Sequence, residues 1–270
     1  MLVDTHCHLN FDSFNNDRGA VLERAREAGV ERILNPGVDL VTSQAAVDLA
    51  ESIPEVFAAV GVHPNDALTW DDDTPDKLRE LAKHPKAVAI GEIGLDYYRN
   101  QTPHDIQKWV FRQQLSIAAE IGLPVVIHMR NTNPEDRQAT VDILQVLSEW
   151  QSELAKVGSP LENNPGVLHS FSDDEEAARQ AIQMNFRIGI TGPVTFRNAP
   201  VLQRVAGSLP LDRLLIETDA PFLTPHPYRG QRNEPAHVRF VAEKIGQIRS
   251  LSYEVVAKAT TTNAMRLFNW

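Results

Sequence analysis

The chain of 270 residues is long enough for one large domain or two small ones, and its apolar (42%) and charged (23%) fractions are typical of an ordinary soluble protein. No apolar run is long enough to cross a bilayer, and Asp4 and His6 interrupt the N-terminus before a signal-peptide core could form, so we expect no membrane association. The formal net charge of −10 argues against a broad surface that coats nucleic acid, but it leaves room for a nucleic acid bound at one end in a local positive site.

Eight short apolar runs predict β-strands. In chain order, these runs are residues 1–8, 32–38, 56–64, 87–96, 124–130, 166–172, 186–195 and 214–221. Segments with helical spacing lie between and after them, at residues 18–29, 43–53, 74–84, 102–122, 137–157 and 175–184 and as a pair within 234–267. The alternation predicts a parallel α/β sheet, and the count of eight favours a closed (β/α)8 TIM barrel over an open doubly wound sheet. Because no linker or break in composition divides the chain, we expect residues 1–270 to form a single TIM-barrel domain.

Two helices carry clear start signals. Thr102 is a candidate N-cap with Pro103 at the first helical position, and Gly122 ends the same helix. The segment Thr74-Pro75-Asp76 repeats the signal, so we expect the preceding acidic run, Asp71–Asp73, to be a solvated loop.

The first predicted strand ends in the sequence His6-Cys7-His8. Side chains alternate between faces in an extended strand, so the two histidines point to one face and Cys7 points to the other. Two imidazoles on one face can hold one metal ion, although a pair of polar residues at a strand end is the simpler alternative. Cys7 is the only cysteine, which excludes an internal disulfide and predicts a packed core thiol in a protein of the reducing cytoplasm.

Polar residues that suit metals or catalysis gather at the ends of six predicted strands. They are His6 and His8 in the first, His63 in the third, Glu92 and Asp96 in the fourth, His128 in the fifth, His169 in the sixth, and Glu217 and Asp219 in the eighth. Any one of them alone would be a loop hydrogen-bonder or a salt-bridge partner. Because the carboxyl ends of barrel strands share one mouth, the joint pattern predicts a metal site there.

The predicted ligand set is too large for one tetrahedral ion. It comprises His6, His8, His128, His169, Glu92 and Asp219. Four imidazoles and two carboxylates suit two divalent ions that share a carboxylate, and Glu92, midway in strand order, is the candidate bridge. Such ligands accept zinc, manganese, nickel or magnesium. Two ions carry more charge than the two carboxylates, so the site would attract a phosphate despite the acidic chain.

Several longer motifs resemble the TatD family of metal-dependent deoxyribonucleases. They are DTHCHLN, GVHP, GEIGLDYYR, PVVIHMR, HSFS, IETDAPFLTP, RGQRNEP and TTTNAMRLF, and they follow the family's order along almost the whole chain. The resemblance implies a (β/α)8 barrel of the metal-dependent hydrolase superfamily that cleaves phosphodiester bonds in DNA, typically as an exonuclease. A narrow site with little surrounding basic surface suits single strands or frayed ends better than the middle of a duplex.

The resemblance also implies a role for each site residue. His6, His8 and Asp219 would hold one ion, and Glu92 would bridge it to a second ion held by His128 and His169. Asp219 would also orient or deprotonate the attacking water. In the substrate-binding part, His63 would contact the substrate and Arg229 would bind phosphate, while a solvated loop is the alternative for Arg229 and Arg232. Glu217 would support the site or form a strand salt bridge.

Three departures from the family pattern limit the transfer. Asn65 stands where the family often has a histidine in His-Pro-His, so one substrate contact is in question. HSFS is followed by Asp173 and Asp174, which places acid where a phosphate would approach. The segment from Asn131 to Gly166 is longer than usual and either extends a helix or covers the site.

Three functions follow from these residues. The first is a divalent-metal phosphodiesterase acting on DNA ends. The second is a related hydrolase of a small molecule with an amide, ester or C–N bond. Enzymes of that kind with two metals often use a modified lysine as bridge, whereas strand four here offers Glu92, and the nearest lysine, Lys86, precedes the strand. The third is a metal-binding scaffold without activity.

Overall fold

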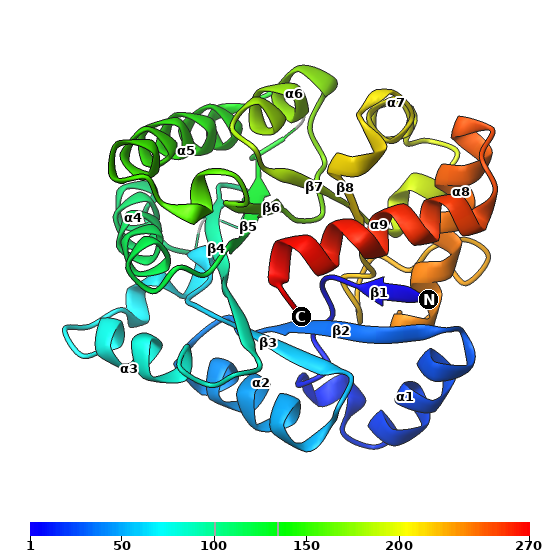
Figure 1. Cartoon of the computed structure of the whole chain (residues 1–270), viewed down its shortest axis with the longest axis horizontal. Coiled ribbons are helices and arrows are strands. Elements are labelled where there is room, and N and C mark those ends of the chain that lie inside the picture. The colour runs from blue at the N-terminus through cyan, green and yellow to red at the C-terminus, as the bar shows by residue number, and fades with distance from the viewer. Residues whose placement is uncertain (100, 134) are drawn as a thin grey trace.

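The computed structural model describes residues 1–99, 101–133 and 135–270. Its eight strands form one parallel sheet in which each strand pairs with the next along the chain, ringed by helices (Figure 1). The strands are β1 (Leu2–Asp4), β2 (Val30–Pro36), β3 (Val56–Val60), β4 (Ala87–Asp96), β5 (Val125–Arg130), β6 (Gly166–Leu168), β7 (Arg187–Ile190) and β8 (Leu214–Ile216). The predicted TIM-barrel fold is confirmed.

The barrel closes just beyond the short strand β1. The backbone N–H of Thr5 donates to Ile216 O at 3.3 Å, and the N–H of Asp219 donates to His6 O at 2.8 Å. The prediction of a first strand reaching His8 was therefore wrong, since β1 ends at Asp4. The segment after β1 nevertheless lies beside the segment after β8, so the first and last strands of the barrel place side chains close together.

The outer layer contains nine α-helices among the described residues. They are α1 (Arg18–Glu27), α2 (Leu40–Ser52), α3 (Thr74–Leu81), α4 (His104–Ile121), α5 (Gln138–Val157), α6 (Glu175–Gln183), α7 (Pro200–Ser208), α8 (Val238–Arg249) and α9 (Tyr253–Phe268). Helix α7 was not among the predicted segments. Its nine residues include a glycine, and the helix packs against α6 and α8. None of the described helices has the length and apolar character of a membrane span.

The helix start signals were only partly correct. The Thr102 side chain does not cap α4, because its hydroxyl donates to Asn65 O at 3.0 Å and the helix begins at His104. The Asp71–Asp73 loop is exposed, as predicted, but Asp71 has a structural role there. Its carboxylate accepts the N–H of Thr74 at 2.8 Å, which satisfies a free donor at the first turn of α3.

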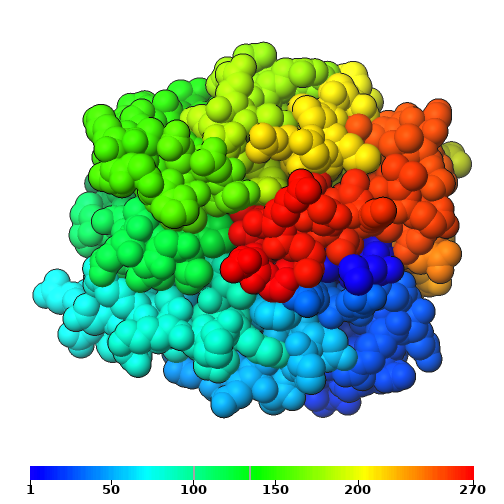
Figure 2. All heavy atoms as spheres, in the orientation of Figure 1, coloured from blue at the N-terminus to red at the C-terminus, as the bar shows by residue number. Residues whose placement is uncertain are grey.

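Helix α9 closes the barrel at the end opposite the carboxyl ends of the strands. Leu267 and Phe268 at its last turn pack with Val3, Leu34 and Leu215 from the strand interiors in one buried apolar cluster. Figure 1 shows α9 lying across this end of the barrel, and in Figure 2 its atoms cover the centre of the face. Apolar packing therefore fills this end and leaves the opposite end, the mouth, for polar groups.

Lys86 lies at the closed end and is not a candidate bridging ligand. Its Nζ donates to the carbonyls of Ala50, Ile53 and Pro54 at 2.8–2.9 Å, at and just beyond the C-terminus of α2. A cation at this place satisfies carbonyls that have no partner within the helix. Lys86 therefore has a structural role, at the end of the barrel opposite the mouth.

We expect Lys86→Met to lower the free energy of unfolding by about 1–3 kcal/mol, since it removes several charge-assisted hydrogen bonds while keeping the aliphatic stem. Urea denaturation followed by circular dichroism measures the change. Lys83→Met is the matched control, because Lys83 is 71% exposed and its ion-pair partner among the described residues is the exposed Glu80, so it should change stability by less than about 0.5 kcal/mol. Equal effects of the two substitutions would contradict the assigned role.

Candidate metal centre

The polar residues predicted at the strand ends meet at the barrel mouth. His6 and His8 follow β1, His63 follows β3, His169 follows β6 and Asp219 follows β8, while Glu92 and His128 lie within β4 and β5. Most of them are buried, and the side chains of His128 and Asp219 keep 17% and 15% of their surface exposed. The structure thus brings together all six residues predicted as ligands.

One half of the cluster surrounds the paired histidines. His6 Nε2 and His8 Nε2 lie 3.2 Å apart, which confirms that both rings turn to the same side. Glu92 Oε2 lies 3.4 and 3.6 Å from these two nitrogens. Asp219 Oδ1 lies 3.8 Å from His6 Nε2 and 3.6 Å from His8 Nε2. A tetrahedral ion with ligand distances of about 2.0–2.1 Å spaces its ligand atoms by about 3.3 Å, so His6, His8 and Glu92 have the spacing of ligands for one divalent ion, and Asp219 lies close to the same two nitrogens.

The other half of the cluster lies on β5 and β6. His128 Nδ1 and His169 Nε2 are each 2.8 Å from Glu92 Oε1 and 3.4 Å from each other. His63 Nε2 lies 3.6 Å from the same oxygen. This second set of nitrogen and oxygen atoms also has the spacing and chemistry of ligands for a divalent ion, and His63, Glu92 and His128 form one such group.

Glu92 connects the two halves, because its two oxygens face different sets of histidines. Burial would raise the pKa of this carboxyl, but His169, His6 and His63 together hold it well below its usual range. Glycines flank the residue on β4: a Cβ on Gly91 would lie 2.7 Å from Val126 Cβ, and Gly94 has a φ of +136°. The motif GEIG therefore lets β4 approach β5 closely enough for Glu92 to meet His128.

Asp96 and Asn65 hold the outer side of His128. Asp96 Oδ2 lies 3.2 Å from His128 Nε2, and the Asn65 amide donates to the same oxygen at 3.3 Å. The sequence placed Asp96 at the strand end without a role, and it treated Asn65 as a missing contact. In the structure Asn65 supports the carboxylate that orients a candidate ligand, an arrangement that frequently fixes which imidazole nitrogen faces a metal.

Glu217 lies beneath the histidines and has a supporting position. Its carboxylate accepts the backbone N–H of Ser170 and the Thr5 hydroxyl, and Oε1 lies 3.8 Å from His169 Nδ1. Burial raises the pKa of this carboxyl to about 7. No lysine or arginine among the described residues lies within ion-pair distance of Glu217, and its ion-pair partner is the candidate ligand His169.

The backbone places Asp219 at the end of β8 through an uncommon conformation. Its φ is +55°, in the left-handed region that aspartate adopts more readily than most residues. Burial would raise the pKa of its carboxyl, but the hydrogen bond to His8 and the nearby rings of His6 and His169 lower it. Asp219 is therefore ionised at neutral pH and lies on the more solvent-exposed side of the cluster.

The two arginines predicted in the loop after β8 differ in their contacts. Arg232 binds Asp17 through two nitrogens at 2.7 and 2.8 Å and lies over the Phe14 ring, so it ties the loop to the N-terminal segment. Arg229 lies over the Phe196 ring at 4.3 Å and has no carboxylate partner among the described residues. Only Arg229 of this pair is free to meet a phosphate.

One arginine pairs with both acidic residues after β6. Arg137, just before α5, lies 3.1 Å from Asp173 and 2.7 Å from Asp174. Asp174 also caps α6, and Asp173 accepts from Asn131 and from the Thr140 hydroxyl. The acid predicted to oppose a phosphate is therefore bound to the long segment, which continues as the outer helix α5.

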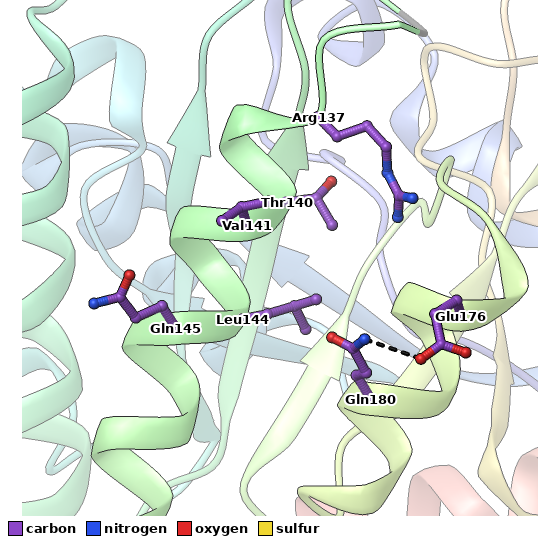
Figure 3. A pocket seen from close by; sticks show the side chains of 7 residues that line it. All are labelled: Arg137, Thr140, Val141, Leu144, Gln145, Glu176 and Gln180. Carbon is purple, nitrogen blue, oxygen red and sulfur yellow. Dashed lines mark hydrogen bonds between the residues drawn. The ribbon is translucent and has the colours of Figure 1, made fainter.

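A surface groove between α5 and α6 lies outside the cluster. It is lined by Arg137, Thr140, Val141, Leu144, Gln145, Glu176 and Gln180 (Figure 3). None of these side chains belongs to the histidine–carboxylate cluster. The candidate metal ligands lie at the mouth of the barrel and not in this groove.

Comparison with known proteins gives consistent results. Residues 3–269 match the family described as TatD related DNase. The chain is 44% identical to the uncharacterized metal-dependent hydrolase YabD of Bacillus subtilis, with 99% of each chain covered. It is 35% identical to the 3′-5′ ssDNA/RNA exonuclease TatD of Erwinia tasmaniensis, covering 99% of this chain and 100% of the relative. Among solved structures, the TatD homologue YjjV of Escherichia coli K12 superposes with a TM-score of 0.89 at 31% identity, covering 100% of this chain and 98% of that one.

We expect Asp173→Asn to lower the free energy of unfolding by about 1–3 kcal/mol, because Arg137 and the groups around it lose a charged acceptor. Thermal denaturation checks this, and Asp72→Asn in the exposed loop before α3 is the control for the same chemical change. The affinity for inorganic phosphate should stay unchanged in both variants. A marked gain in phosphate affinity for Asp173→Asn alone would show that its charge does reach the site.

Proposed function

Because the chain belongs to the TatD related DNase family, a family of metal-dependent hydrolases, we propose that it is a divalent-metal-dependent deoxyribonuclease that hydrolyses phosphodiester bonds at the ends of single-stranded DNA. The exonuclease named among its relatives supports this choice of substrate. The observation that carries the proposal is that the two carboxylate oxygens of Glu92 face different histidines. Oε2 faces His6 and His8, while Oε1 faces His128 and His169. A shared carboxylate between two imidazole sets suits a pair of ions on one phosphoryl group.

We assign each proposed ion to the donor atoms that lie close to one another. His6, His8, Glu92 and Asp219 would hold the first, and Glu92, His128 and His169 would hold the second. His63 and Asp96 flank the second set, so His63 is placed to contact either the substrate or the ion. When bound, divalent ions supply Lewis acidity to a phosphoryl oxygen and make a water molecule more acidic.

The protein's own groups supply the remaining steps. Asp219, ionised and partly open to the mouth, takes the proton of the attacking water. Arg229 binds a phosphate oxygen through its planar fork, and His63 orients the substrate from the side of β3. The histidines are buried within one mouth of an acidic protein. A site of this kind favours the end of a DNA strand over the middle of a duplex as substrate.

The metal content of variants tests the ligand assignment. We expect the protein loaded with Mn²⁺ or Zn²⁺ to retain about two equivalents of ion after gel filtration. His8→Ala should lose one and His128→Ala the other, while Glu92→Ala should weaken both because the shared carboxylate is gone. Inductively coupled plasma mass spectrometry measures the content, and His84→Ala outside the mouth is the control. Full retention by Glu92→Ala would contradict the bridging role.

Degradation of an end-labelled single-stranded DNA by the metal-loaded protein tests the activity. We expect products that shorten progressively from one end, and a rate lower by at least about 10²-fold in Asp219→Asn and Glu92→Gln. The exposed Asp72→Asn variant should cleave like the unmodified protein. Label at each end in turn gives the direction of digestion.

Absence of cleavage by protein shown to hold metal would overturn the nuclease proposal. The same cluster would then be assigned to hydrolysis of a small molecule with an amide, ester or C–N bond. Turnover of a panel of such compounds, lost in Glu92→Gln, would establish that activity.

A further inference from the structure

Four arginines at the mouth have no carboxylate partner among the described residues. Arg99 follows β4, Arg130 ends β5, Arg197 follows β7 and Arg229 follows β8, and all four are exposed. On the outer helices some arginines pair closely with carboxylates, as Arg24 does with Glu234, whereas others, such as Arg204, have no such partner among the described residues. An acidic chain thus leaves uncompensated guanidinium groups around the one opening that leads to the candidate metal centre.

Exposed aromatic rings accompany these arginines. Tyr98 is 57% exposed, and the Arg130 guanidinium lies over its ring at 4.1 Å. Phe222 is 49% exposed, with its ring centroid 6.4 Å from that of His8. Large exposed apolar groups that lie beside a buried polar site indicate a surface that contacts a ligand, whereas scattered ones do not.

The two aromatic groups lie on opposite sides of the mouth. Tyr98 follows β4 and Arg130 is the last residue of β5, whereas Phe222 and Arg229 follow β8. In a closed ring of eight sequential strands, β4 and β8 are four strands apart in either direction. A ligand that contacts both groups must pass over Glu92 and its histidines, which lie between them.

Building on the proposed function, we propose that these residues form the track for a single-stranded nucleic acid: Tyr98 and Phe222 stack on unpaired bases, and Arg130 and Arg229 bind the backbone phosphates on either side of the scissile bond. Stacking tolerates any base, because every base offers a flat face, and guanidinium groups match phosphate oxygens. Bases in a duplex are already stacked on their neighbours, so the track selects single strands.

Binding measurements separate the contribution of bases from that of phosphates. The probe is a fluorescent single-stranded phosphorothioate oligonucleotide, which resists hydrolysis, added to the metal-loaded protein and followed by anisotropy. We expect Tyr98→Leu and Phe222→Leu each to weaken binding about 5-fold or more, as loss of one stacked base predicts. An abasic strand of equal length should bind all three proteins equally, while Tyr98→Phe should bind like the unmodified protein.

Salt dependence identifies the phosphate contacts. Arg130→Gln and Arg229→Gln should weaken binding of both the normal and the abasic strand, and each should reduce the slope of log affinity against log salt by about 0.7. Arg204→Gln is the control for charge, because Arg204 is exposed on α7 in the outer layer. Trp109→Leu is the control for aromatic surface, since Trp109 is 51% exposed on α4.

The outcomes distinguish this inference from the function on which it rests. If the unmodified protein cleaves single-stranded DNA but the leucine variants bind the normal strand as tightly as it does, the stacking track is wrong and the nuclease proposal stands. Unchanged salt slopes in both glutamine variants would likewise remove the phosphate contacts. If the protein neither binds nor cleaves the strand, both proposals fail.

Discussion

The carboxylate of Glu92 sets the main constraint on this structure. A buried ionised carboxyl loses several kcal/mol of hydration and persists only where positive or hydrogen-bonding groups compensate the loss. Histidines from β5 and from the segments after β1, β3 and β6 converge on its two oxygens, at distances from 2.8 to 3.6 Å. No single strand can supply so many partners, so the compensation requires a closed barrel. The same convergence that allows Glu92 to stay charged produces the arrangement that suits two cations.

Function and stability occupy opposite ends of the barrel. The last turn of α9 plugs the closed end with Leu267 and Phe268, and Lys86 satisfies the carbonyls at the end of α2 on that side. The mouth, by contrast, contains buried polar groups such as Asp4 and Glu217, and burial raises the pKa of both carboxyls. Polar groups of this kind oppose folding, so apolar packing elsewhere must hold the strands in register. Chemistry can therefore change at the mouth while the closed end preserves the fold.

The sequence was sufficient to predict features that depend on local pattern. Eight apolar runs predicted the barrel, and the polar residues at their ends predicted all six candidate ligands. The alternation of side chains along a strand predicts the face that each one takes, and the carboxyl ends of the barrel strands share one mouth. The sequence was insufficient for features that depend on distant contacts. β1 ends at Asp4, although Thr5 and His6 still hydrogen-bond to Ile216 and Asp219, and Thr102 bonds Asn65 instead of capping α4. The partner of Asp173 and Asp174, Arg137, is about forty residues away, so the charge of this pair could not be judged from its neighbours.

The candidate ligands lie within the strands or directly after them and are mostly buried, whereas the groups that would meet a substrate are exposed. Glu92 and His128 lie within β4 and β5, whereas Tyr98, Phe222 and Arg229 lie in the loops that follow β4 and β8. A hydrolase of small molecules and a nuclease can therefore share the same ligands and differ only at the rim, where the former needs an enclosed pocket and the latter an open track. The exposed rings of Tyr98 and Phe222 suit an open track, as does the guanidinium of Arg229, which has no carboxylate partner among the described residues. The two functions would therefore differ at the rim and not in the candidate metal ligands.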